Sequence, residues 1–217
     1  MVAIMFARVL PAQTTVSFPT EDGGLVYGDV YGEGIRGVVL AHGGQFNKES
    51  WKKQATVLAT AGFHVLAIDF RGYGPSRGPG QADPLSAPLY LDVLAAVRYL
   101  GEIGAKTVSV VGASMGGWAA GEASIRSEPG AMDRIVFLGS APNGDAEKLK
   151  ARSLFIVARD DTSGDGPRLP GIRAQYEKTP QPKELMIVDG SAHAQFLFQT
   201  DQGEKVMRAI LGFLSAK

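Results

Sequence analysis

The sequence predicts an α/β protein built on a doubly wound, mostly parallel sheet. Two observations carry this prediction: an N-terminal hairpin signal, and after it a regular alternation of short apolar runs with amphipathic stretches of helical length. The 217 residues are 45% hydrophobic and 20% charged. Because this size and composition suit one soluble globular unit, we expect residues 1–217 to form a single domain.

The hairpin signal comes first along the chain. Residues 14–18 and 25–31 read as strands on either side of the turn Glu-Asp-Gly-Gly at residues 21–24. Six apolar runs rich in β-branched residues follow, without the alternation of a half-exposed strand, as is typical of strands covered on both faces. These runs are residues 38–41, 65–70, 108–111, 135–138, 154–158 and 185–188.

Candidate helices lie between these strands. They are residues 50–60, 89–100, 116–127, 169–178 and 202–214. We expect the first of them to open with Ser50 as its N-cap, since serine is a favoured capping residue. Residues 141–152 alone separate two of the predicted strands, which is too little chain for a lid domain.

Composition excludes several classes of function. Lys plus Arg and Asp plus Glu both number 22, without a long basic run, which argues against a nucleic-acid partner. The chain has no cysteine, so disulfides, thiolate metal sites and a cysteine nucleophile are excluded. The Gly-x-Gly-x-x-Gly pattern at residues 32–37 leads into a strand rather than a helix, so we expect a turn there and no dinucleotide site. The sequence has no P-loop and no His-Glu-x-x-His zinc motif, and we therefore expect no cofactor or metal.

The chain also lacks an apolar run close to the roughly 18 residues that suggest a spanning helix, so no membrane partner is expected. Residues 1–10 are apolar but interrupted by Arg8, and they lack the charged start of a secretory signal. A first strand or a frayed tail is favoured there over a degenerate signal. We expect a cytoplasmic protein, with secretion left open, that is a monomer or a small homo-oligomer.

The strongest chemical signal is the segment Gly-Ala-Ser-Met-Gly-Gly at residues 112–117, which lies directly between a predicted strand and a predicted helix. A nucleophile on so sharp a turn needs a strained backbone and neighbours without bulk, which Gly112 and Gly116 supply. Such a turn lifts the serine hydroxyl clear of the sheet. Ser114 is therefore the predicted nucleophile.

A serine hydroxyl needs a base to remove its proton, and imidazole has a suitable pKa. The chain has three histidines. His64 lies at the start of a strand, at the edge opposite the expected site, and His42 precedes two glycines, where we expect it to brace a loop. His193 follows the last strand, in a loop that can hang over the sheet, and is the predicted base.

A carboxylate should hold the imidazole in its correct tautomer. Asp160 and Asp161 both follow the strand at residues 154–158. We favour Asp161, because it lies further past the strand end and can turn toward the site, whereas Asp160 is expected to cap the loop or face solvent. Asp69, at another strand end, is a less favoured candidate because it precedes Ser114.

An oxyanion hole needs backbone N–H groups aimed at the developing charge. Met115, the residue after the nucleophile, is expected to give one. The second is expected from the His-Gly-Gly-Gln loop at residues 42–45, with Gly44 as first choice and Gln45 as second, since glycine allows close approach of the backbone.

These motifs together resemble the α/β-hydrolase superfamily over nearly the whole chain. The resemblance rests on residues 42–44, the segment Asp-Phe-Arg-Gly-Tyr-Gly-Pro-Ser at 69–76, residues 112–117, the pair 160–161 and the segment Gly-Ser-Ala-His at 190–193. It implies an eight-stranded sheet with only the second strand antiparallel, an acyl-enzyme mechanism, and Asp161 at the acid position. The chain looks like the small capless esterases and dienelactone-hydrolase-like proteins. Because the latter typically carry a cysteine nucleophile, dienelactone activity itself is not expected.

The resulting expectation is a serine hydrolase that cleaves small or short-acyl carboxylic esters. Without a lid the site is open, which disfavours long acyl chains. Phe46, Trp118 and Phe196 are candidate pocket walls, although core packing is the simpler role for each, and residues 162–171 are expected to border the site. A thioesterase or serine peptidase with the same triad, and a non-catalytic binding protein of this fold, remain alternatives.

Overall fold

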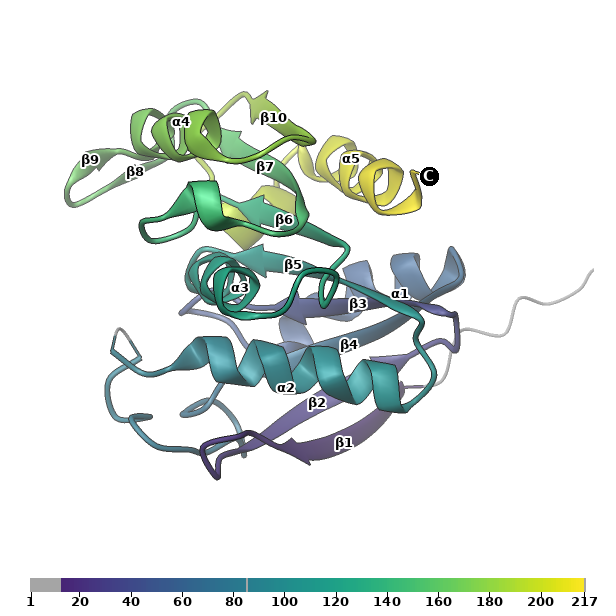
Figure 1. The fold of residues 1–217 in the computed structure, drawn as a ribbon. Helices are drawn as coiled ribbons and strands as arrows, with labels where there is room; N and C mark the ends of the chain where they lie inside the picture. Colours follow the sequence, from purple (N-terminus) through teal and green to yellow (C-terminus); the bar gives the residue numbers. More distant parts are fainter. Residues whose placement is uncertain (1–12, 85, 217) are drawn as a thin grey trace, which may run out of the picture.

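A computed structural model describes residues 13–84 and 86–216, and an eight-stranded sheet forms its centre (Figure 1). The strands are β1 (Gln13–Pro19), β2 (Leu25–Tyr31), β3 (Arg36–Ala41), β4 (Phe63–Asp69), β5 (Thr107–Ala113), β6 (Arg134–Leu138), β7 (Arg152–Ala158) and β10 (Lys183–Val188). Their order across the sheet is β1-β2-β4-β3-β5-β6-β7-β10. All eight predicted strands are present, with ends that shift by at most two residues.

Strand directions follow the expected pattern. β2 is antiparallel to both of its neighbours, β1 and β4. The remaining pairs, from β4 through β3, β5, β6 and β7 to β10, are all parallel. The mostly parallel sheet with an antiparallel second strand is therefore confirmed.

Helices cover both faces of the sheet, as expected for a doubly wound fold. They are α1 (Lys52–Thr60), α2 (Leu89–Glu102), α3 (Met115–Arg126), α4 (Arg168–Lys178) and α5 (Gly203–Ser215). Buried side chains of α2, α3 and α4 pack in one apolar cluster, and those of α1 and α5 pack in a second cluster across the sheet. β3 shows why the predicted strands are apolar at successive positions. Val39 packs in the first cluster, on one face of the sheet, and its neighbours Val38 and Leu40 pack in the second cluster, on the other face.

Several short elements were not predicted. They are the 3₁₀ helices η1 (Lys48–Trp51), η2 (Ala146–Lys148) and η3 (Ala194–Gln199), and a small hairpin of β8 (Thr162–Ser163) and β9 (Gly166–Pro167). The prediction that Ser50 caps the first helix is wrong. Ser50 lies inside η1, and the side chain of Asn47 accepts a hydrogen bond from the Ser50 N–H instead.

The segment between β6 and β7 consists of residues 139–151 and carries only η2, so this position holds no lid domain. The Gly-rich pattern at residues 32–37 runs directly into β3, as predicted. No helix within residues 13–84 and 86–216 has the length and apolar character needed to cross a bilayer. The predictions made for residues 1–10 lie outside the described residues.

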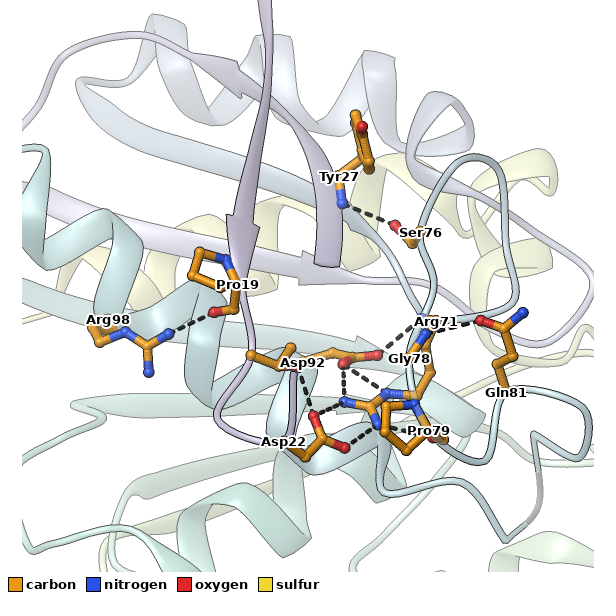
Figure 2. A network of polar contacts seen from close by, with 11 residues as sticks. Pro19, Asp22, Tyr27, Arg71, Ser76, Gly78, Pro79, Gln81, Asp92 and Arg98 are labelled. Atoms are coloured by element: carbon orange, nitrogen blue, oxygen red, sulfur yellow. Dashed lines mark hydrogen bonds and ion pairs between the residues drawn. The ribbon is translucent and has the colours of Figure 1, made fainter. Parts of the chain in front are cut away.

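A buried arginine organises the loop after β4 (Figure 2). Arg71 is fully buried, and its Nε and Nη2 donate to Asp92 Oδ1 on α2 at 2.9 and 2.7 Å. Its Nη2 also donates to Asp22 Oδ1 at 3.0 Å, and its Nη1 donates to the Pro79 carbonyl at 3.0 Å. One guanidinium therefore ties this loop to α2 and to the β1–β2 turn, because a buried charge must be fully paired.

Candidate active site

Ser114 occupies a strained turn between β5 and α3. Its backbone has φ 49° and ψ −113°, a conformation that non-glycine residues rarely adopt. A Cβ atom at Gly112 would lie 2.4 Å from the Gly116 carbonyl oxygen, and one at Gly116 would lie 2.3 Å from the Ala41 carbonyl oxygen. The turn therefore requires glycine at both positions, as the sequence predicted.

A chain of hydrogen bonds links the three side chains that were predicted to act together. His193 Nε2 lies 2.8 Å from Ser114 Oγ, and His193 Nδ1 lies 2.8 Å from Asp161 Oδ2. Asp161 is fully buried, whereas the His193 side chain is 26% exposed. A hydroxyl, an imidazole and a buried carboxylate linked in this order can, chemically, activate the hydroxyl as a nucleophile.

The other two aspartates lie elsewhere. Asp160 is exposed, and its N–H donates to the Gly190 carbonyl at 3.0 Å. Asp69 is buried and pairs with Lys48, accepting from the Lys48 backbone N–H at 2.8 Å. Neither carboxylate is hydrogen-bonded to His193.

The other two histidines are buried, and neither is hydrogen-bonded to Ser114 or Asp161. His64 is buried near the start of β4, and His42 is fully buried at the end of β3. His42 Nε2 accepts from the Phe70 N–H at 3.2 Å, so its Nδ1 carries the proton and donates to the Gly43 carbonyl at 2.9 Å. Burial lowers the pKa of His42, which favours this neutral form.

The loop after β3 packs against the Ser114 turn. A Cβ atom at Gly43 would lie 3.5 Å from Ser114 Cβ, and one at Gly44 would lie 3.9 Å from Met115 Sδ. In the part of the chain that the structure describes, the N–H groups of Gly44, Gln45 and Met115 have no hydrogen-bond acceptor. These three N–H groups are thus free to bind a ligand, and the contacts place Gly44 beside Met115, the residue after Ser114.

Two residues that hold this loop were not found from the sequence. Gln195 is buried, and its Oε1 accepts from the Gly43 N–H at 2.8 Å while its Nε2 donates to Ser50 Oγ at 2.9 Å. The Tyr73 hydroxyl donates to the Gly44 carbonyl at 3.0 Å. Gln195 lies two residues after His193, so one short segment carries both the imidazole and an anchor of the loop.

Arg168, at the start of α4, was also missed. Its Nε lies 3.4 Å from Asp161 Oδ1, the carboxylate oxygen that His193 does not use. The signal in the sequence was weak, since Arg168 belongs to the 162–171 segment that was only expected to border the site.

Cavities open beside this arrangement. One of about 220 Å³ is lined by Met115, Trp118, Pro84, Ala87, Leu89 and Tyr90 among others. Another of about 310 Å³ is lined by Trp118, residues 139–144 and the start of α4 among others. Trp118 is therefore a pocket wall. Phe46 and Phe196 pack on each other, with ring centroids 4.8 Å apart, and Phe46 also lines a cavity of about 380 Å³. Among the described residues, no group of three or more His, Asp or Glu side chains is placed to hold a metal ion.

Comparison with known proteins gives consistent findings. A family model described as the alpha/beta hydrolase family matches residues 38–211. A protein of Rattus norvegicus named as a candidate protein-lysine deacylase is 26% identical over 184 residues, which is 79% of this chain and 81% of the relative. Bifunctional epoxide hydrolase 2 of Sus scrofa is 38% identical over 82 residues, 37% of this chain but only 14% of that much longer protein.

Solved structures share the fold. An esterase from Pyrococcus furiosus superimposes with a TM-score of 0.78, covering 94% of this chain and 92% of its own at 19% identity. At that identity the likeness describes the fold alone.

Proposed function

This chain belongs to the α/β-hydrolase family, and from that premise we propose that it is a serine hydrolase that cleaves small or short-acyl carboxylic esters. The observation that carries the proposal is the hydrogen-bonded series Ser114–His193–Asp161, with both links at 2.8 Å. A second support is the strained backbone of Ser114, since strain of this kind costs of order 1–3 kcal/mol and is concentrated at functional sites.

In the proposed reaction, Ser114 Oγ attacks the ester carbonyl carbon while His193 Nε2 takes the hydroxyl proton. The tetrahedral intermediate then breaks its bond to the alcohol oxygen, and His193 gives its proton to the departing alkoxide. Water, deprotonated by His193, then attacks the acyl carbon. The bond from that carbon to Ser114 Oγ breaks, His193 returns the proton to Oγ, and the carboxylic acid leaves. Asp161 accepts from Nδ1–H throughout, which holds the tautomer and stabilises the imidazolium.

The oxyanion formed in both halves of the reaction is assigned to the N–H of Met115 and to that of Gly44, with Gln45 as the alternative second donor. Met115 begins α3, so its N–H also gains from the positive end of the helix dipole. One such donor contributes about 3–4 kcal/mol to transition-state stabilisation.

Cavity size supports a short acyl group. The pocket beside Met115 has a volume of about 220 Å³, below the roughly 300–1,000 Å³ of typical drug-sized ligand sites. With no lid over the site, a long chain would leave most of its apolar surface in water and gain little binding energy.

The test uses p-nitrophenyl acetate, butyrate and octanoate with the wild-type protein and with Ser114→Ala. We expect hydrolysis to decline from butyrate to octanoate, and the variant to lose at least about 10⁴-fold in kcat. Equal activity in the two proteins would contradict a Ser114 nucleophile, and a preference for octanoate would contradict the short-acyl assignment.

Removal of acyl groups from lysine side chains is a second candidate. The rat relative, which matches over 79% of this chain, favours it. The same triad serves amides when His193 protonates the leaving amine. Release of acetate from an acetyl-lysine peptide, lost in Ser114→Ala and faster than hydrolysis of butyl acetate, would support this candidate over the ester.

A further inference from the structure

Three residues that line the cavity of about 310 Å³ each contact one member of the Ser114–His193–Asp161 series. Trp118 donates its backbone N–H to the Ser114 carbonyl at 3.1 Å. Gly139 lies against the imidazole, since a Cβ atom there would be 3.0 Å from His193 Nδ1. Arg168 faces the carboxylate of Asp161 at 3.4 Å. The cavity is thus next to the reacting groups rather than remote from them.

Arg168 is the one charged residue among the described residues that line this cavity. Its side chain is 28% exposed, and its Nε faces Asp161 without forming a hydrogen bond. Its two terminal NH₂ groups have no partner within residues 13–84 and 86–216. Asp161 is meanwhile hydrogen-bonded to His193 through its other oxygen. The planar guanidinium therefore still has the paired donors that match a carboxylate.

The remaining lining combines apolar side chains, among them Trp118 and Ile172, with polar groups. Ser140 is 3% exposed, and its hydroxyl has no hydrogen-bond partner among the described residues. Gln175 Oε1 is likewise buried without a partner in this part of the chain. A buried polar group without a partner costs free energy, so these positions favour a ligand that carries hydrogen-bonding atoms.

The direction of proton transfer from His193 indicates which half of an ester lies in the cavity of about 310 Å³. His193 must return its proton to the leaving oxygen, so the alcohol half departs on the imidazole side. Gly139 lies against His193 Nδ1 and Arg168 against Asp161, so the cavity borders the imidazole and its aspartate, and the alcohol half is assigned to it. The smaller pocket contains Met115, on the oxyanion side, and is left for the acyl half.

We propose that Arg168 binds a carboxylate on the alcohol half of the substrate, so that the preferred substrates are short-acyl esters of small hydroxy acids. This inference rests on the proposed serine esterase function. Each turnover would consume one water and release a short carboxylic acid and a hydroxy acid, with the carbonyl–oxygen bond of the ester broken.

The test compares butyryloxyacetate with isobutyl butyrate, which has a similar shape and no charge. Wild-type protein, Arg168→Gln and Arg173→Gln are assayed with both esters; Arg173 is an exposed residue of the same helix and serves as the matched control. We expect the wild type and the control to prefer butyryloxyacetate. Arg168→Gln should raise KM for that ester about tenfold or more and leave KM for the neutral ester unchanged.

Other outcomes separate the two proposals. An equal fall of kcat for both esters in Arg168→Gln would show that Arg168 acts only through Asp161 and would overturn the inference. Equal use of both esters by the wild type would also overturn it. In both cases the esterase function stands. Absence of Ser114-dependent hydrolysis of either ester would overturn the esterase function itself. If Arg168→Gln does not fold, Arg168→Lys replaces it in the test. Lysine keeps the positive charge but lacks the paired planar donors of the guanidinium, so KM for butyryloxyacetate must rise by a smaller factor.

Discussion

At the scale of single residues, the site depends on which of two adjacent carboxylates turns inward. Asp160 and Asp161 both follow β7, but Asp161 is fully buried against His193 whereas Asp160 is exposed. The Asp161 backbone contributes as well, since its carbonyl accepts from the Arg168 N–H at 2.9 Å. Its N–H also donates to the Ala158 carbonyl at 3.2 Å, so two backbone hydrogen bonds fix the carboxylate before any substrate is present, which is the preorganisation that catalysis needs.

The first prediction uses this pair. Asp161→Asn should lower kcat by about 10⁴-fold, because an amide cannot hold the correct tautomer or stabilise the imidazolium. Asp160→Asn is the matched control and should stay within about twofold of wild type, as expected for an exposed position. Steady-state kinetics with p-nitrophenyl butyrate measures both. The reverse ranking would assign the acid to Asp160.

At the scale of elements, the strands and long helices were predictable because their apolar patterns repeat over several residues. The short elements η1, η2, η3 and the β8–β9 hairpin have too few residues to show a period. The same limit applies to the site. Ser114, Asp161 and His193 could be proposed because each follows a strand, whereas Gln195 binds Gly43, which lies 152 residues away in sequence. No local pattern marks such a contact.

Gln195 gives the second prediction. Gln195→Met keeps the side-chain length but removes both hydrogen bonds, so the loop that carries Gly44 loses an anchor. Because an oxyanion donor acts in the transition state, we expect kcat to fall about 10- to 100-fold with little change in KM. Gln199→Met, at the exposed end of the same η3 helix, is the control. Gln195→Glu keeps an acceptor for the Gly43 N–H and should recover part of the kcat that Gln195→Met loses. If Gln195→Met instead lowers thermal stability and leaves kcat unchanged, Gln195 contributes to folding alone.

At the scale of the whole molecule, parallel strands bring distant segments to one edge of the sheet. β3, β5, β7 and β10 all run in the same direction, and the Gly44 loop, Ser114, Asp161 and His193 follow their respective ends. Ligands bind at this edge in open α/β sheets. The loop after β4 joins them there through Tyr73, and the Arg71 network of Figure 2 holds that loop against α2 and the β1–β2 turn.

The network makes the stability of the whole molecule depend on pH, which is the third prediction. Hydrogen bonds from Arg71 lower the pKa of Asp22 to about 2, from an ordinary value of 3.8. The stabilisation that Asp22 contributes is therefore fully present above about pH 4 and is lost as the pH falls toward 2. In this range the Asp22 carboxyl is protonated in the unfolded chain but still ionised in the folded protein, so acidification favours unfolding. Urea unfolding between pH 5 and 2.5 should show that Asp22→Asn is less stable than wild type at pH 5, and that the difference shrinks on acidification. Glu21→Gln, at the exposed neighbouring position, should track the wild type at every pH. Parallel curves for Asp22→Asn and wild type would mean that the Arg71–Asp22 contact adds no stability and that Asp92 and the Pro79 carbonyl suffice to hold Arg71.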